Sequence, residues 1–157
     1  MTNIELFQSV RRDELDQFRR LLEDADLAMV TEGKRNLLHV AIAYRKPHHA
    51  RELILCGIDI NWHDANGETP LHYAAIHNQL ETARLILEHG GNLSLTDKHG
   101  NTPLWCAAFN ARGNYETVTL FLQKGAEANN KNKHGRSPLD FAQQIEDRKL
   151  IDMLSTK

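Results

Sequence analysis

Histidine is the residue type in this chain that is best suited to chemistry. The 157 residues include nine histidines and two cysteines. Imidazole can ligate zinc or act as an acid or base near neutral pH. Zinc sites usually show close spacings, such as two histidines four residues apart with a third ligand, and that pattern is absent here. We therefore expect no metal and no cofactor, and a histidine-based metal-binding protein is the least favoured alternative.

Two short motifs resemble fragments of catalytic sites. His63-Asp64 is a dipeptide found in some phosphohydrolases, but it has no partner motif. Gly33-Lys34 lacks the earlier glycine of a phosphate-binding loop. No Ser-His-Asp or Cys-His arrangement follows from the spacing of such residues. We predict that the protein is not an enzyme.

Charge and composition limit the partners and the compartment. The net charge is −2, with −4 over residues 1–32 and +2 over residues 96–157. This balance argues against nucleic acid or an anionic membrane as the main partner. The sequence has no apolar run long enough for a transmembrane helix and no basic, apolar signal segment at Met1–Glu5. Two distant cysteines, Cys56 and Cys106, suit a reducing compartment, so we expect a cytoplasmic protein.

The elements that would position any functional side chain recur with a period of about 33 residues. Leu38, Leu71, Leu104 and Leu139 are separated by 33, 33 and 35 positions. A turn glycine, a proline at a helix start and a glycine after a second helix recur with them. These are Gly67, Gly100 and Gly135; Pro70, Pro103 and Pro138; and Gly57, Gly90 and Gly125.

Five such units account for the chain as a single domain, residues 1–157. We place them at about 2–31, 32–62, 63–95, 96–130 and 131–157, with the first and last as capping units. The last unit is expected to end in a polar helix over residues 146–154. The fourth unit contains two extra residues between its helices, in the segment 109–115.

The segment Thr69-Pro70-Leu71-His72-Tyr73-Ala74, with this period, resembles the ankyrin repeat family. The resemblance implies an all-α ankyrin-repeat α-solenoid, in which helix-turn-helix units are joined by β-turn fingers. It also implies that His39 and His72 hydrogen-bond the turns rather than react. We expect short acceptors before the turn glycines to close Asx-type turns. These acceptors are Asp64, Asp97 and Asn132. For Trp105, packing between inner helices is favoured over the alternative of a binding anchor.

In this family the positions between the signature residues face the partner, across the fingers and the concave face. The second unit lacks the turn glycine, so only Arg35 is assigned to its finger. Two features stand out: the last two fingers are basic, and Tyr44, Ile76 and Phe109 form an expected row of exposed apolar groups. The predicted partner-binding residues are Arg35, Tyr44, His63, Asn66, Glu68, Ile76, His77, Lys98, His99, Asn101, Phe109, Asn110, Arg112, Lys131, Lys133, His134 and Arg136.

These features predict a non-enzymatic protein–protein interaction module whose partner is another protein with an acidic surface patch. One specific hypothesis is a bacterial immunity protein that neutralises a cognate toxin. The alternative is an adaptor or inhibitor of a cellular enzyme. Nucleic acid and membrane are not expected partners.

Overall fold

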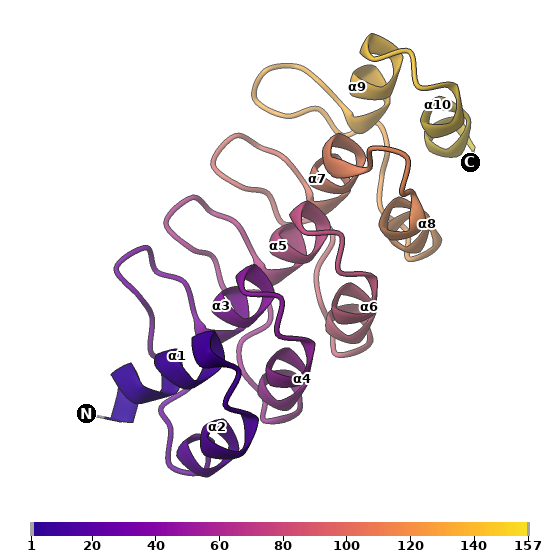
Figure 1. Cartoon of the computed structure of the whole chain (residues 1–157). Helices are drawn as coiled ribbons and strands as arrows, with labels where there is room; N and C mark the ends of the chain where they lie inside the picture. Colours follow the sequence, from indigo (N-terminus) through magenta and orange to yellow (C-terminus); the bar gives the residue numbers. More distant parts are fainter. Residues whose placement is uncertain (1, 157) are drawn as a thin grey trace.

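The computed structural model describes residues 2–156, which form ten α-helices and no β-strand (Figure 1). Each odd-numbered helix packs against the even-numbered helix that follows it. The helices are α1 Thr2–Arg12, α2 Leu15–Leu22, α3 Leu37–Ala43, α4 Pro47–Leu55, α5 Pro70–Ile76, α6 Leu80–Glu88, α7 Pro103–Asn110, α8 Glu116–Gln123, α9 Pro138–Gln144 and α10 Arg148–Ser155. Within the described residues, no helix is long and apolar enough to cross a membrane.

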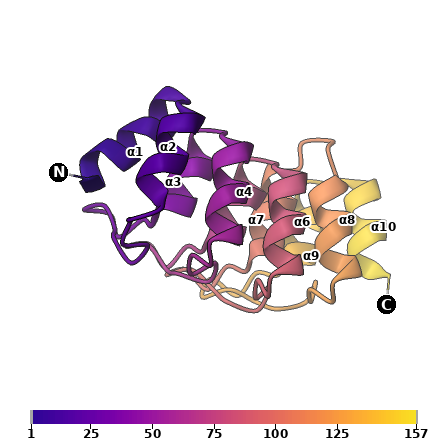
Figure 2. The ribbon, with the colours of Figure 1, turned by 90° about the horizontal axis from the view of Figure 1, so that it is seen from below.

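The helices form two rows (Figure 1). The inner row is α1, α3, α5, α7 and α9, and the outer row is α2, α4, α6, α8 and α10. Four loops project from the inner row on the side away from the outer row. The loops leave from the same end of the helices (Figure 2). We call these loops the fingers and number them from the N-terminus: residues 30–35, 63–68, 96–101 and 131–136. This is the predicted all-α solenoid.

Each inner helix after α1 is preceded by a polar residue that caps its first turn. Pro70, Pro103 and Pro138 occupy the first helical position of α5, α7 and α9, where the missing N–H is not needed. The Thr102 hydroxyl accepts the N–H of Trp105 at 3.3 Å. Asn36 caps α3 in the same way, although the second unit has neither the Thr nor the Pro.

The core runs along the stack between the two rows. The repeated leucines Leu38, Leu71 and Leu104 are fully buried, because an inner helix packs on either side of each. Leu139 is only half-buried, since among residues 2–156 no further helix packs beyond α9. The stack thus buries each unit against its neighbours, as expected for repeats that cannot form a core alone.

Two details differ from the sequence expectation. The last helix begins at Arg148 rather than at residue 146, because the Asp147 side chain accepts the N–H of Leu150 and caps it. The two-residue insertion has a structural partner: the Tyr115 hydroxyl donates to the Asp147 carboxylate at 2.8 Å. This bond raises the pKa of Tyr115 and ties the insertion to α10.

Candidate functional site

The fingers are built on buried oxygen acceptors. Asp64 Oδ1 accepts the backbone N–H groups of Asn66 and Glu68 at 2.8 and 2.9 Å. Asp97 and Asn132 do the same in the third and fourth fingers. The predicted Asx-type turns are therefore confirmed. Because the turn acceptor points inward, the residues after it are displayed at the surface.

The first finger is regular, contrary to the sequence expectation. It is closed by the same bond as the others, here from the N–H of Thr31 to the carbonyl of Arg35 at 3.0 Å. The Thr31 hydroxyl replaces the buried carboxylate and accepts the N–H of Arg35. Lys34 replaces the turn glycine, with φ of 56°. The motif was missed because a threonine and a lysine perform the work of aspartate and glycine.

Neighbouring fingers are joined by one backbone hydrogen bond each. The donor and acceptor pairs are Ala65 N to Gly33 O at 2.8 Å, Lys98 N to Asn66 O at 2.8 Å, and Lys133 N to His99 O at 2.9 Å. A side chain at Gly67 or Gly100 would approach the next finger's backbone nitrogen to 2.9 Å. The fingers therefore form one continuous surface of fixed spacing.

His72 is part of the scaffold. Its Nδ1 accepts the N–H of Thr69 at 3.1 Å, and its Nε2 donates to the carbonyl of Asn101 at 2.9 Å. A carbonyl can only accept, so Nε2 carries a proton, and Nδ1 carries none because it accepts; the ring is therefore neutral. His39 makes the equivalent contact to the carbonyl of Glu68 at 2.8 Å. The expectation that both histidines hold the turns is confirmed.

Burial favours the neutral forms of four side chains of this scaffold: two histidines, a cysteine and a tyrosine. Burial lowers the pKa of His39 to about 4 and also lowers that of His72. It raises the pKa of the Cys106 thiol, which disfavours the thiolate. Burial also raises the pKa of Tyr73, whose hydroxyl donates to Asp64 at 2.9 Å. Among the described residues, no group of three or more His, Cys, Asp or Glu could hold a metal ion.

The predicted partner-binding residues divide into two sets. Most are exposed: Arg35, Tyr44, His63, Lys98, His99, Phe109, Arg112, Lys131, Lys133, His134 and Arg136. The others are half-buried: Asn66, Glu68, Ile76, His77, Asn101 and Asn110.

The expectation of an exposed row of Tyr44, Ile76 and Phe109 was wrong for its middle member. Ile76 is half-buried because it packs against the core, whereas Tyr44 and Phe109 are 45% and 50% exposed. The Asn101 side chain is also committed, because it bonds Asp97 and Asn132. Ile76 and Asn101 therefore offer a partner less free surface than the exposed members of the predicted set.

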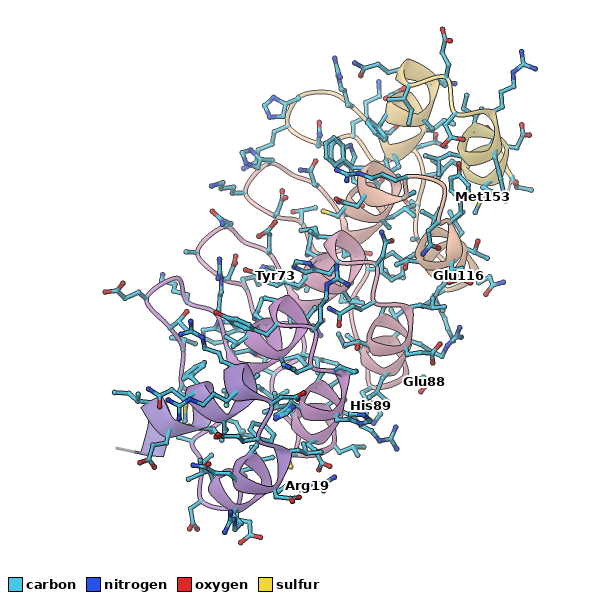
Figure 3. All side chains as sticks on the ribbon, in the orientation of Figure 1. Arg19, Tyr73, Glu88, His89, Glu116 and Met153 are labelled. Carbon is cyan, nitrogen blue, oxygen red and sulfur yellow. The ribbon has the colours of Figure 1, made fainter. Side chains whose placement is uncertain are left out.

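The two ends of the inner face differ in charge and shape. Near the N-terminal end, the Arg35 guanidinium lies over the Tyr73 ring at 5.7 Å. Beside it, burial and then the nearby Asp64 and Asp97 carboxylates raise the pKa of Glu68. This part of the face is of mixed charge. In Figure 3, Tyr73 lies among the inner helices, whereas Glu88 and Glu116 lie on the outer row.

At the C-terminal end, three aromatic rings meet across two units. Trp105 stacks on Phe109, with ring centroids 5.2 Å apart and planes 15° apart. Phe141 of α9 lies 5.7 Å from Trp105 and 5.2 Å from Phe109. Trp105 packs between inner helices as expected, but it is partly exposed. Phe141 was not among the predicted partner-binding residues, although it occupies the unit position of Tyr73.

We call Trp105, Phe109 and Phe141 the aromatic cluster. It lies beside the third and fourth fingers, which carry exposed cations and no exposed carboxylate. Asp97 is the only acidic residue in residues 96–101 and 131–136, and it is buried in its turn. The exposed cations are Lys98, Lys131, Lys133 and Arg136. Apolar and basic groups are thus displayed together.

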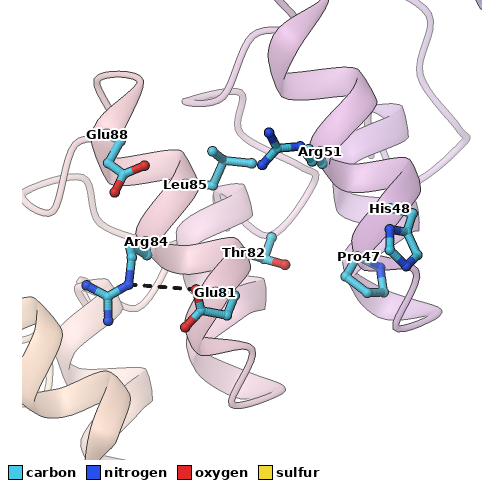
Figure 4. Close-up of a pocket in the computed structure, with 8 residues that line it drawn as sticks. All are labelled: Pro47, His48, Arg51, Glu81, Thr82, Arg84, Leu85 and Glu88. Carbon is cyan, nitrogen blue, oxygen red and sulfur yellow. Dashed lines mark ion pairs between the residues drawn. The ribbon is translucent and has the colours of Figure 1, made fainter.

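A depression of about 400 Å³ lies on the outer row, between α4 and α6 (Figure 4). It is lined by groups of both signs, including Arg51, Glu81 and Arg84. Arg84 pairs with Glu81 at 3.8 Å on the same helix. Because these charges partly balance one another within the depression, it does not favour a partner of either charge.

Comparison with known proteins agrees with the geometry of stacked helix pairs and hydrogen-bonded fingers. A family model described as "Ankyrin repeats (3 copies)" matches residues 6–97 and, separately, residues 38–132. This chain belongs to the ankyrin repeat family. Ankyrin repeats in general are non-enzymatic modules that bind other proteins, using the extended surfaces that stacked repeats create.

A curated relative shows the same repeats in a much larger protein. The ankyrin and IPT/TIG repeat-containing protein of Schizosaccharomyces pombe is 39% identical over 54 residues. The match covers 34% of this chain and 5% of that protein. The similarity therefore concerns the repeats alone.

Proposed function

We propose that this ankyrin repeat chain is a non-enzymatic module that binds an acidic protein surface, mainly through its third and fourth fingers and the aromatic cluster. One observation carries the proposal: the four exposed cations and the aromatic cluster occupy the same end of the inner face. Aromatic groups supply buried contact area in interfaces, and complementary charge speeds association and selects the partner. The mixed charge of the N-terminal end offers no comparable match.

The first prediction concerns the basic fingers. Changing Lys131, Lys133 and Arg136 together to Glu should weaken the complex with a purified partner by at least about 100-fold at low salt, mainly through slower association. The melting temperature should stay within a few degrees, because all three side chains are exposed. The partner would first be identified by cross-linking and then purified. Surface plasmon resonance would measure its association and dissociation rates with each variant.

A matched variant provides the control. Arg20, Arg51 and Arg148 are exposed on the outer row, and changing them to Glu alters the net charge by the same amount. This control should bind the partner nearly as well as the unchanged protein. Equal loss in both variants would show that net charge, and not this face, determines binding.

The partner's identity is a separate question. The hypothesis of a bacterial immunity protein predicts that the partner is a toxin encoded beside this chain, and that co-expression protects cells from it. The adaptor or inhibitor hypothesis predicts a cellular enzyme as the recovered partner. Sequencing the neighbouring genes and identifying the cross-linked protein distinguish the two.

A further inference from the structure

A pocket of about 540 Å³ lies between the third and fourth fingers and the inner helices. Its size is within the range of sites that hold a small ligand or one or two side chains. Its walls combine the finger tips with one member of the aromatic cluster. The lining residues are His99, Asn101, Trp105, Asn132, His134 and Arg136.

The polar groups on the pocket floor are already paired. Asn132 Nδ2 donates to Asn101 Oδ1 at 2.8 Å, and Asn132 Oδ1 accepts two backbone N–H groups of its own finger. The Asn101 amide also donates to Asp97. The floor therefore has few acceptors left for a ligand that brings donors.

The walls, in contrast, are rich in donors. Arg136 uses Nη1 toward Gln144, which leaves most of its five N–H donors for a ligand. The rings of His99 and His134 lie 6.0 Å apart, and among residues 2–156 they have no hydrogen-bond partner. Each imidazole has at least one N–H. A ligand that brings acceptors can therefore pair with the Arg136 guanidinium and with an N–H of each imidazole at the same time.

The charge of the pocket indicates which acceptor group a ligand would present to it. Arg136 is its one permanent charge, and a guanidinium pairs with a carboxylate through two parallel hydrogen bonds. A single carboxylate matches this charge better than a doubly charged phosphate. A metal ion is disfavoured because Arg136 would repel it.

The aromatic wall indicates what stands next to the carboxylate. Trp105 lines the pocket, and Phe109, half exposed, stacks on it. A large apolar side chain beside the carboxylate would cover these rings.

We propose that this pocket recognises an aspartate or glutamate side chain that is adjacent to a large apolar side chain in a peptide segment of the partner. Arg136 pairs with the carboxylate, the two imidazoles donate to it, and the aromatic cluster contacts the apolar neighbour. The assignment deepens the proposed function and rests on it.

Trp105 itself provides the measurement. The chain has two tryptophans, so in a Trp62→Phe variant Trp105 is the sole tryptophan reporter. Trp62 donates to the Lys34 carbonyl near the first finger, away from the pocket. The probe is an N-acetylated, C-amidated peptide in which glutamates flank leucine and phenylalanine. We expect saturable change in Trp105 emission.

Matched peptides and variants separate the contributions. Replacing glutamates by glutamine, or the apolar residues by serine, should each weaken binding by about tenfold or more, as should Arg136→Gln. Phe109→Ala should weaken binding of the probe but not of the serine peptide. Arg148→Gln removes a cation from the outer row and should leave affinity unchanged.

Several results would overturn the assignment. These are no saturable binding of the probe, equal binding of the glutamine peptide, tighter binding of a phosphoserine peptide or an oligothymidylate, or a requirement for a free C-terminal carboxylate. If the probe fails while the Lys131, Lys133 and Arg136 variant still loses the partner, the pocket assignment is wrong and the interaction face stands. If the probe binds while that variant retains the partner, the proposed function is wrong, and the pocket binds acidic peptides without taking part in the partner complex.

Discussion

His72 shows how a reactive residue type can be used for architecture. Its two ring nitrogens join the start of α5 to the third finger, and the bond that Nδ1 accepts requires the neutral ring. Its pKa is lowered mainly by burial, in agreement with that role. The signature histidine is therefore a link between units rather than a site of chemistry.

Removing this link should destabilise the protein. His72→Ala leaves the buried N–H of Thr69 without its partner, and we expect a loss of about 2 kcal/mol in the free energy of unfolding. Urea denaturation followed by circular dichroism would measure it. His48→Ala changes an exposed histidine on α4 and should cost less than about 0.5 kcal/mol. Equal losses would contradict the role given to His72.

At the scale of elements, the fingers depend on close approach as well as on turn geometry. Gly100 and Gly135 have nearly the same backbone angle, with φ of 78° and 74°. A Cβ at Gly100 would lie 2.9 Å from the Lys133 nitrogen, whereas a Cβ at Gly135 would meet nothing within 4 Å. The two glycines therefore separate strain within one finger from contact between fingers.

This pair gives a matched prediction. Gly135→Ala should cost about 1 kcal/mol, from the left-handed backbone alone. Gly100→Ala should cost about 2–4 kcal/mol, because it also forces the fourth finger away. Chemical denaturation of both variants would test the difference. Similar costs would indicate that the hydrogen bonds between fingers are not rigid.

The inserted segment after α7 supports the last helix pair. Tyr115 bonds Asp147, and the Lys149 ammonium lies 5.0 Å from the centre of the Tyr115 ring. Tyr115→Phe keeps the ring and removes only the hydrogen bond, so it should speed hydrogen exchange in α10 several-fold and leave α4 unchanged. Mass spectrometry of exchanged fragments would show this. Uniform acceleration along the chain would contradict a local role.

The repeat pattern was enough to predict the elements but not all of the site. Pro70, Pro103 and Pro138 mark helix starts because the local chain alone determines them. The contact between Trp105 and Phe141 depends on how side chains of adjacent units turn toward each other, which periodicity does not specify. The first finger was missed because Thr31 and Lys34 depart from the motif while keeping its hydrogen bonds.

At the scale of the whole molecule, buried histidines link stability to pH. Burial lowers the pKa values of His39, His49, His72 and His77. Between about pH 6.5 and 4, the unfolded chain therefore binds more protons than the folded chain, and stability falls as the pH falls. The raised pKa of Glu68 acts in the opposite sense, but it is a single group.

The size of this effect can be measured. The lowering of the His39 pKa from 6.5 to about 4 alone corresponds to a loss of about 3 kcal/mol by pH 4. We expect the urea midpoint to be nearly constant from pH 8 to pH 7 and to decline steadily below about pH 6.5. His39→Asn should flatten this decline. A midpoint that did not change down to pH 5 would contradict the assignment.

The aromatic cluster also has an evolutionary consequence. Repeat arrays change by gaining or losing whole units, and a unit copied between α4 and α5 would lengthen this array without disturbing the pocket. A unit copied between α8 and α9 would instead separate Trp105 from Phe141, which meet only because their helices are neighbours. The last two units are therefore expected to be inherited as a pair, while the number of units before them is free to vary among descendants.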